Sequence, residues 1–217
     1  MIKDKNPEVL GEVMNGLVLT GSAISLYGDS RPASGAEHQM SHFWETIFDQ
    51  MGVSRSMHGE QVATGTVLVL MLAEEILKIV PNFNKAREFA NSYDEASWEE
   101  KIKAVYKASS GEILELEKKA QKNNPDFQLK RIDNMEKNWD AIIRQLSTLP
   151  SSDSLKCILE DSGCTCTPRD IGVDKELLKD TFMYCKEVRP RYTIFQMAYD
   201  LGILDELSDK VIDRISY

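Results

Sequence analysis

Apolar residues recur along this chain every three to four positions, which is the spacing of helices that bury one face. No convincing run alternates apolar and polar residues, as half-buried strands do. The pattern therefore predicts an all-α protein. Capping residues, Pro and Gly mark where the helices of this chain are expected to begin and end. Helices are expected over about 7–21, 33–50, 58–80, 98–122, 127–147, 152–161, 174–187, 193–202 and 204–215, with a capped turn at 167–170.

The first predicted helix is unusual because it contains Gly11, Gly16 and Gly21 among its apolar residues. Each glycine in a helix interior costs roughly 1 kcal/mol relative to alanine. Glycines are expected in an apolar helix where another backbone packs closely against it. We therefore expect this helix to be buried. Tryptophans at apolar helical positions are expected in the core; they are Trp44, Trp98 and Trp139.

No segment is expected to enter a membrane or to direct export. The longest apolar stretch, Val62 to Ala73, has about twelve residues, whereas a spanning helix needs about 20. The N-terminus has acidic residues and no apolar region close behind, unlike a signal peptide. A cytoplasmic location is the default expectation, and the cysteines are then thiols. Cys157 and Cys185 are expected in the core, and the Cys164–Cys166 pair is only a weak signal for metal or redox chemistry.

Composition limits the partners of this chain. The 217 residues are enough for one domain, and 42% of them are hydrophobic, so a packed core is expected. The formal net charge of −9 argues against a nucleic-acid groove and against binding to an anionic membrane surface.

The three histidines are crowded into a short part of the chain, at His38, His42 and His58. His38 and His42 are four residues apart, so on a helix they share a face with β-carbons about 5–6 Å apart. Helix residues 38–50 rise roughly 18 Å. The eight steps to His58 reach at most about 26 Å, so the chain can return it to His38. One shared site is permitted but not required, and solvated or packed histidines remain an alternative.

Histidine donors alone do not select a metal, because imidazole suits Zn, Fe, Ni and Co. Catalytic sites usually use three protein ligands and keep an open position for substrate or water. A carboxylate is the expected type of third ligand.

Residues 30–45 read SRPASGAEHQMSHFWE, and residues 58–66 read HGEQVATGT. These two strings around the histidines closely resemble sn-glycerol-1-phosphate dehydrogenases. The SRPASGAEH part is specific. The HxxxH and HGE parts are shared with the superfamily that includes glycerol dehydrogenase, iron-type alcohol dehydrogenases and dehydroquinate synthase. Residues 168–172 (PRDIG) and 191–194 (RYTI) resemble the same family, so the resemblance covers most of the chain.

The resemblance implies a role for each histidine. His38 and His58 would bind a divalent metal, Zn or Ni, and His42 would lie near the substrate and the nicotinamide. The implied reaction is hydride transfer between NADH or NADPH and dihydroxyacetone phosphate, which gives sn-glycerol 1-phosphate. Arg31, with Ser30 and Ser34, is a candidate contact for the substrate phosphate. A turn that merely opens a helix is the alternative for this segment.

The chain also departs from the family pattern. It contains no Gly-rich strand-to-helix turn of the dinucleotide-binding kind. The family's third metal ligand is an Asp well upstream of the histidine pair, and neither Asp4 nor Asp29 lies in a matching motif. Residues 1–217 are thus expected to form the C-terminal helical metal- and substrate-binding domain, without its first segment and without the N-terminal nucleotide-binding domain. Alone, this domain is expected to be inactive and to bind metal weakly.

Two other functions remain possible at this stage. The first is a dehydroquinate-synthase-like lyase, which shares the histidine pattern. The second is a non-catalytic helical interaction module with an exposed apolar patch near residues 30–60. The expected partners are a small phosphorylated substrate and a second copy of the chain in a dimer, and neither nucleic acid nor membrane.

Overall fold

The computed structural model describes residue 4 and residues 6–215, and the described residues contain helices and turns but no strand. The all-α prediction is confirmed. The helices are α1 (Pro7–Tyr27), α2 (Ala36–Met51), α3 (His58–Ile76), α4 (Phe83–Asn91), α5 (Glu95–Tyr106), α6 (Ser110–Ala120), α7 (Pro125–Leu146), α8 (Ser152–Asp161), α9 (Lys175–Tyr184), α10 (Ile194–Asp200) and α11 (Leu204–Asp213). Short 3₁₀ turns lie at Arg31–Ala33, Lys107–Ser109, Arg169–Ile171 and Cys185–Glu187.

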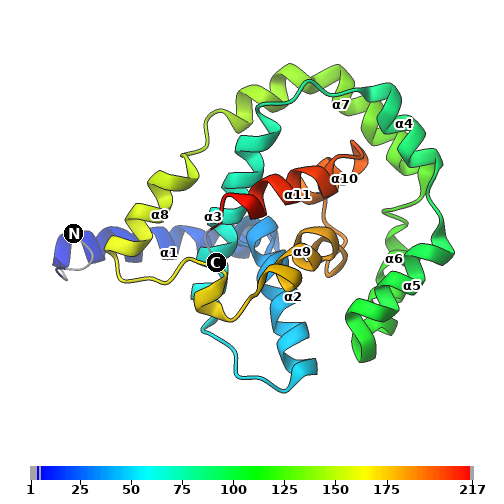
Figure 1. The fold of residues 1–217 in the computed structure, drawn as a ribbon. Helices are drawn as coiled ribbons and strands as arrows, with labels where there is room; N and C mark the ends of the chain where they lie inside the picture. The colour runs from blue at the N-terminus through cyan, green and yellow to red at the C-terminus, as the bar shows by residue number, and fades with distance from the viewer. Residues whose placement is uncertain (1–3, 5, 216–217) are drawn as a thin grey trace.

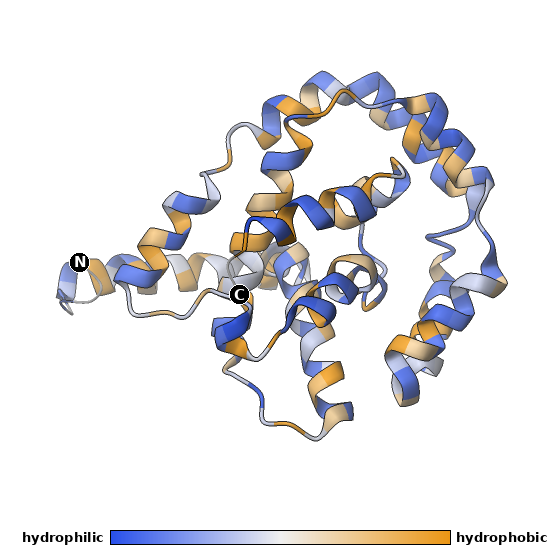
Figure 2. Ribbon diagram, viewed as in Figure 1, coloured by the Kyte–Doolittle hydropathy of each residue, from blue (hydrophilic) through white to orange (hydrophobic). Residues whose placement is uncertain are grey.

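Helices α2 and α3 lie in the centre of the fold, together with α9, α10 and α11 (Figure 1). Helices α4 to α7 form an arc around one side of this centre, and apolar and polar residues are interleaved along them (Figure 2). The central helices supply most of the fully buried side chains, including Phe43, Trp44, Leu72, Phe182 and Phe195. This packing fixes α2 relative to α3, and these two helices carry the histidines.

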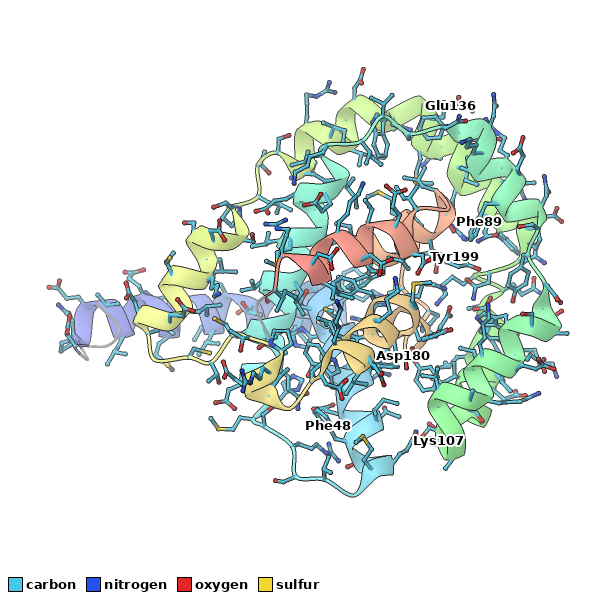
Figure 3. All side chains as sticks on the ribbon, viewed as in Figure 1. Phe48, Phe89, Lys107, Glu136, Asp180 and Tyr199 are labelled. Carbon is cyan, nitrogen blue, oxygen red and sulfur yellow. The ribbon has the colours of Figure 1, made fainter. Side chains whose placement is uncertain are left out.

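Specific contacts tie the arc and the C-terminal helices to the centre. The Trp44 Nε1 donates a hydrogen bond of 2.7 Å to Thr181 Oγ1, which joins α2 to α9. The rings of Phe89 and Tyr199 pack edge to face with centroids 5.2 Å apart and join α4 to α10 (Figure 3). Trp44 is fully buried, whereas Trp98 and Trp139 are partly buried against the same core, so the core prediction for the tryptophans is confirmed.

The helix predicted over 98–122 is wrong, because the structure has two helices there. α5 ends at Tyr106 and α6 begins at Ser110, with Lys107 between them at a positive φ of 43°. A left-handed backbone at a residue other than glycine cannot continue a helix. The predicted third helix is also shorter, since α3 ends at Ile76.

Helix α4 was not predicted at all. Its N-cap, Asn82, accepts a hydrogen bond from the backbone of Lys85, and its buried face consists of the small residues Ala86 and Ala90. Asparagine before an apolar residue is a recognised start signal. Because alanine is small and only weakly hydrophobic, these two residues do not produce a clear helical pattern of apolar positions in the sequence.

The burial predicted for α1 is wrong. Its start and end follow expectation: Asn6 accepts from the Glu8 backbone, and Gly28 ends the helix at a φ of 77°. None of its residues is buried in this chain, and a β-carbon added at Gly11, Gly16 or Gly21 would meet nothing within 4 Å. Helix α1 extends outward beside the body of the fold (Figure 1).

The expectation about membrane-length segments also needs correction at α1. This helix has 21 residues and a mean hydropathy of 1.4, so by length and composition it is long and apolar enough to cross a membrane. Interspersed Gly, Ser and Thr residues divide its apolar sequence, so α1 contains no uninterrupted apolar run of that length.

The cysteines are free thiols, as predicted. Cys185 lies in the core, but Cys157 is exposed, which corrects the expectation that both are buried. Burial raises the pKa of Cys164 and of Cys166 above the ordinary thiol value. Since the thiolate is the reactive and metal-binding form, this position gives no support to a redox or metal role.

Candidate functional site

The fold brings the three histidines together. His38 and His42 lie on one face of α2, and the loop after Gly52 returns the chain so that His58 begins α3 beside them. The ring centroids are 5.4 Å apart for His38 and His58, 6.2 Å for His38 and His42, and 5.8 Å for His42 and His58. The three rings, which the chain length allowed to meet, therefore do lie together.

Each imidazole is oriented by a carboxylate. His38 Nδ1 lies 2.7 Å from Glu37 Oε1, and the Nδ1 atoms of His42 and His58 lie 3.0 Å from the two oxygens of Glu45. Metal-binding histidines commonly hold one ring nitrogen against a carboxylate in this way, which fixes the ring and raises the basicity of the other nitrogen. The arrangement leaves the three Nε2 atoms as the candidate ligand atoms.

Glu45 orients two of the three imidazoles. Burial raises the pKa of its carboxyl, but the hydrogen bonds and charges of His42 and His58 outweigh burial and hold the pKa below its usual value. Glu45 is thus a carboxylate at neutral pH and can accept from both rings. Ser41 adds a further contact to His58, with its Oγ 3.1 Å from Nδ1.

The site is accessible from solvent and incomplete as a metal centre. The His58 side chain is 47% exposed and that of His38 is 21% exposed. Among the described residues, no group of three or more His, Cys, Asp or Glu side chains is placed to hold a metal ion. Two histidines would fill only two positions of a tetrahedral set, and no third ligand accompanies them among the described residues. Asp29 does not supply it, since it pairs with arginines.

The candidate phosphate contacts lie together, in the turn between α1 and α2. Arg31 and Ser34 line a cavity of about 310 Å³. Ser30 lies next to it and accepts a hydrogen bond of 3.1 Å from Arg191. Arg191 lines the same cavity, although it is more than 150 residues away in sequence.

Arg191 is the residue that sequence reasoning missed. It belongs to the RYTI stretch that contributed to the family resemblance, but nothing local indicated what it contacts. The signals in the sequence were the family resemblance of the stretch and its position immediately before a helix.

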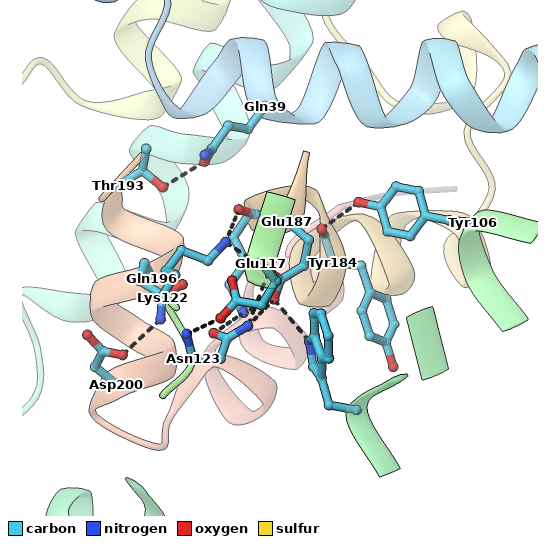
Figure 4. A network of polar contacts seen from close by, with 12 residues as sticks. Gln39, Tyr106, Glu117, Lys122, Asn123, Tyr184, Glu187, Thr193, Gln196 and Asp200 are labelled. Carbon is cyan, nitrogen blue, oxygen red and sulfur yellow. Dashed lines mark hydrogen bonds and ion pairs between the residues drawn. The ribbon is translucent and has the colours of Figure 1, made fainter. Parts of the chain in front are cut away.

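A second polar cluster lies apart from the histidines and is structural. Glu187 pairs with Lys122 and Lys186 and accepts from Asn123 in the core, between the arc and α10 (Figure 4). Burial raises the pKa of Glu187, but the two lysines outweigh it and lower the pKa to about 2. The pairing satisfies these charges within the fold, so no catalytic role is needed to explain them.

Comparison with known proteins confirms the resemblance to the glycerol-1-phosphate dehydrogenases. The chain is 27% identical over 192 residues to the glycerol-1-phosphate dehydrogenase [NAD(P)+] of Geobacillus stearothermophilus, a match that covers 88% of this chain and 38% of the relative. It is 45% identical over 69 residues to the enzyme of that name from Archaeoglobus fulgidus, covering 32% of this chain and 18% of the relative. The enzyme of that name from Staphylothermus marinus is 40% identical over 72 residues, which cover 33% of this chain and 19% of the relative.

The chain thus spans less than two fifths of the length of these curated relatives. No protein-family model matches it, and neither does any solved structure.

Proposed function

We propose that this chain is the helical, metal- and substrate-binding part of an NAD(P)-dependent sn-glycerol-1-phosphate dehydrogenase. The observation that carries the proposal is the convergence of three imidazoles, each oriented through Nδ1 by Glu37 or Glu45. The names of the relatives support the reaction class.

Within this proposal the histidines have separate roles. His38 and His58 hold a divalent metal, Zn or Ni, through Nε2. When bound, such a metal acts as a Lewis acid toward the carbonyl of dihydroxyacetone phosphate. His42 lies beside both rings and faces the substrate and the nicotinamide. Glu45 orients His42 and His58 together, so one carboxylate positions a metal ligand relative to the substrate-facing ring.

The substrate phosphate binds at the turn between α1 and α2 in this proposal, at Arg31, Ser30 and Ser34. A chain with a net charge of −9 needs local positive charge to attract a phosphorylated substrate and an anionic cofactor. Arg31 lines the cavity described above and supplies part of that charge.

We also propose that residues 1–217 form one domain that is inactive alone and binds metal weakly. Two imidazoles do not complete a catalytic metal site. The described residues contain no strand on which a dinucleotide-binding turn could be built. NADH or NADPH would therefore be held by a nucleotide-binding domain outside these residues.

The experiment is a metal titration of the purified chain, with Co²⁺ as a spectroscopic probe and with Zn²⁺ and Ni²⁺ by calorimetry. We expect weak binding that is lost in His38→Ala and in His58→Ala, because each removes one of two ligands. Asp49→Asn, on the exposed side of the same helix, is the control and is expected to bind as the parent does. Equal binding by the alanine variants would contradict histidine ligation.

The inactivity has its own test. The purified chain is incubated with metal, dihydroxyacetone phosphate and either NADH or NADPH, and absorbance at the nicotinamide band is followed. No turnover is expected. Appreciable reduction of the ketone would refute this part of the proposal.

A second candidate function, a helical interaction module, is favoured by the exposed side chains of α1. Leu17, Val18 and Leu19 are each more than 60% exposed. The apolar patch expected near residues 30–60 is represented only by Met51, Val53 and Met57. A second copy of the chain is the expected partner, as in the predicted dimer. Light scattering after size exclusion tests it: a parent dimer that Leu17→Glu converts to a monomer supports it, and a monomeric parent contradicts it.

The remaining expectations stay predictions. The reported relatives carry a dehydrogenase name, so the lyase alternative gains no support from them. The cytoplasmic location and the lack of nucleic-acid or membrane partners still rest on the sequence alone. Helix α1 is the segment that could contradict the expectation of no membrane partner, because it is long and apolar enough to cross a membrane.

A further inference from the structure

The cavity between the α1–α2 turn and the segment before α10 is lined by two arginines from opposite ends of the chain. Arg31 and Ser34 contribute one wall, and Arg191 and Thr193 contribute the other. We propose that Arg191, together with Arg31, binds the phosphate group of the substrate and is a specificity-determining residue. This inference rests on the proposed function and adds a residue to it.

Arg191 is held in place before any ligand binds. Its side chain is only 17% exposed. Nη1 donates to the Ser34 carbonyl at 2.6 Å, and Nη2 donates to Ser30 Oγ at 3.1 Å and meets Asp29 Oδ1 at 3.2 Å. These contacts use three of the five N–H donors of the guanidinium, one on Nη1 and both on Nη2. A phosphate bound by the fork would therefore replace Asp29 at Nη2, and because the guanidinium is already oriented, this exchange costs little side-chain entropy.

Asp29 lies where an anion would be expected to bind. Its carboxylate is 3.2 Å from Arg191 Nη2 and 3.7 Å from Arg31 Nε, so it meets both guanidinium groups. It also accepts from the Arg31 backbone N–H at 2.9 Å. A phosphate has more negative charge and more acceptor oxygens than a carboxylate, and it would compete with Asp29 for the same donors.

Both walls of the cavity are connected to the histidine site. The Gly35 N–H donates to Glu37 Oε1 at 2.8 Å, and that oxygen orients His38. Thr193 Oγ1 donates to Gln39 Oε1 at 2.7 Å (Figure 4), and Gln39 follows His38 in α2. Gln39 is 1% exposed, and its Nε2 has no hydrogen-bond partner. A phosphate in this cavity therefore lies next to the residues that flank a proposed metal ligand, as a short phosphorylated ketone requires.

The test is calorimetric titration of the full chain with inorganic phosphate, and then with dihydroxyacetone phosphate. Arg191→Gln and Arg31→Gln are each expected to weaken phosphate binding about tenfold or more, as the loss of charge-assisted hydrogen bonds predicts. Arg191→Lys should retain part of the affinity. Arg189→Gln is the matched control, because Arg189 is exposed two residues away and should leave binding unchanged.

Asp29→Asn gives a change in the opposite direction. The amide oxygen keeps the contact with the Arg31 backbone while the competing charge is removed, so phosphate should bind several-fold more tightly. Thermal melting without phosphate shows whether each variant is folded. In folded variants, phosphate affinity that is unchanged in Arg191→Gln would overturn the inference, and so would a parent chain that binds no phosphate at millimolar concentration.

This experiment separates the two proposals because phosphate binding needs neither metal nor nucleotide. His38→Ala and His58→Ala should retain phosphate binding. If metal binding proves independent of the histidines while phosphate binding depends on Arg191, the proposed function fails and the anion site stands. If histidine-dependent metal binding is found while Arg191→Gln binds phosphate normally, only the anion site fails.

Discussion

At the scale of single residues, Glu45 has more influence on the candidate site than any one histidine, because it orients two of them. Glu45→Gln replaces one acceptor oxygen with a donor and cannot accept from both rings. Loss of such an orienting carboxylate usually costs about 10–100-fold in metal affinity, and we expect a loss of this size for Co²⁺. Titration beside Asp49→Asn measures it. Unchanged affinity in Glu45→Gln would mean that the contacts with His42 and His58 do not support metal binding.

Some residues of the candidate site could be predicted from a local sequence pattern, and others could not. The spacing of His38, His42 and His58 and the length of the loop between them are visible in the sequence, so their convergence could be anticipated. Arg191 could not be placed, because its contacts with Ser30 and Ser34 depend on how the two ends of the chain pack. Periodicity reports which face of a helix is buried and says nothing about such long-range pairing.

At the scale of elements, the crossing of α2 over α3 positions the histidines, and Gly65 permits the close approach. A β-carbon at Gly65 would lie 2.9 Å from the Glu37 carbonyl oxygen. Gly65→Ala must therefore push the helices apart next to His38. We expect a loss of about 1–3 kcal/mol in the free energy of unfolding, as for other overpacked sites. Metal affinity should fall as well.

Gly59→Ala is the matched control in the same helix, because a β-carbon at Gly59 meets nothing within 4 Å. Alanine is favoured over glycine in a helix, so this variant should be neutral or slightly stabilised. Denaturant unfolding compares the two variants. Equal stability of both would show that the approach of the two helices at Gly65 is not tight.

Most elements were predictable because their caps and apolar periods agree, as in α7 after Asn124 and α8 after Ser151. The failures have physical causes. The break between α5 and α6 depends on a positive φ at Lys107, a residue with no local preference for that conformation. In α1 the period is clear, but a helical period cannot show whether a packing partner lies within the same chain.

At the scale of the whole molecule, the chain has a formal net charge of −9, and a compact set of opposite charges is enclosed in its core. Glu187 lies 2.8 Å from the Lys122 ammonium and also pairs with Lys186. These contacts join the segment after α6 to the segment after α9, far apart in sequence. The cluster therefore links the helical arc to the centre that carries the histidines.

This cluster predicts how stability depends on pH. Burial acts to raise the pKa of Glu187, but the lysines lower it to about 2, against an ordinary value of 4.5. A carboxyl whose pKa is depressed by folding stabilises the protein fully above its unfolded pKa. That contribution is lost progressively as the pH falls from about 4.5 toward 2. Urea unfolding at a series of pH values in this window should show it.

Glu187→Gln tests the origin of that loss. At neutral pH the variant leaves two buried ammonium groups without their carboxylate, which usually costs about 3–5 kcal/mol. Its stability should then vary less between pH 4.5 and pH 2, because the group that titrates in this window is gone. Glu206→Gln removes only a surface ion pair with Lys210 and should keep the parent's pH dependence. A Glu187→Gln curve as steep as the parent's would show that other carboxylates govern acid unfolding.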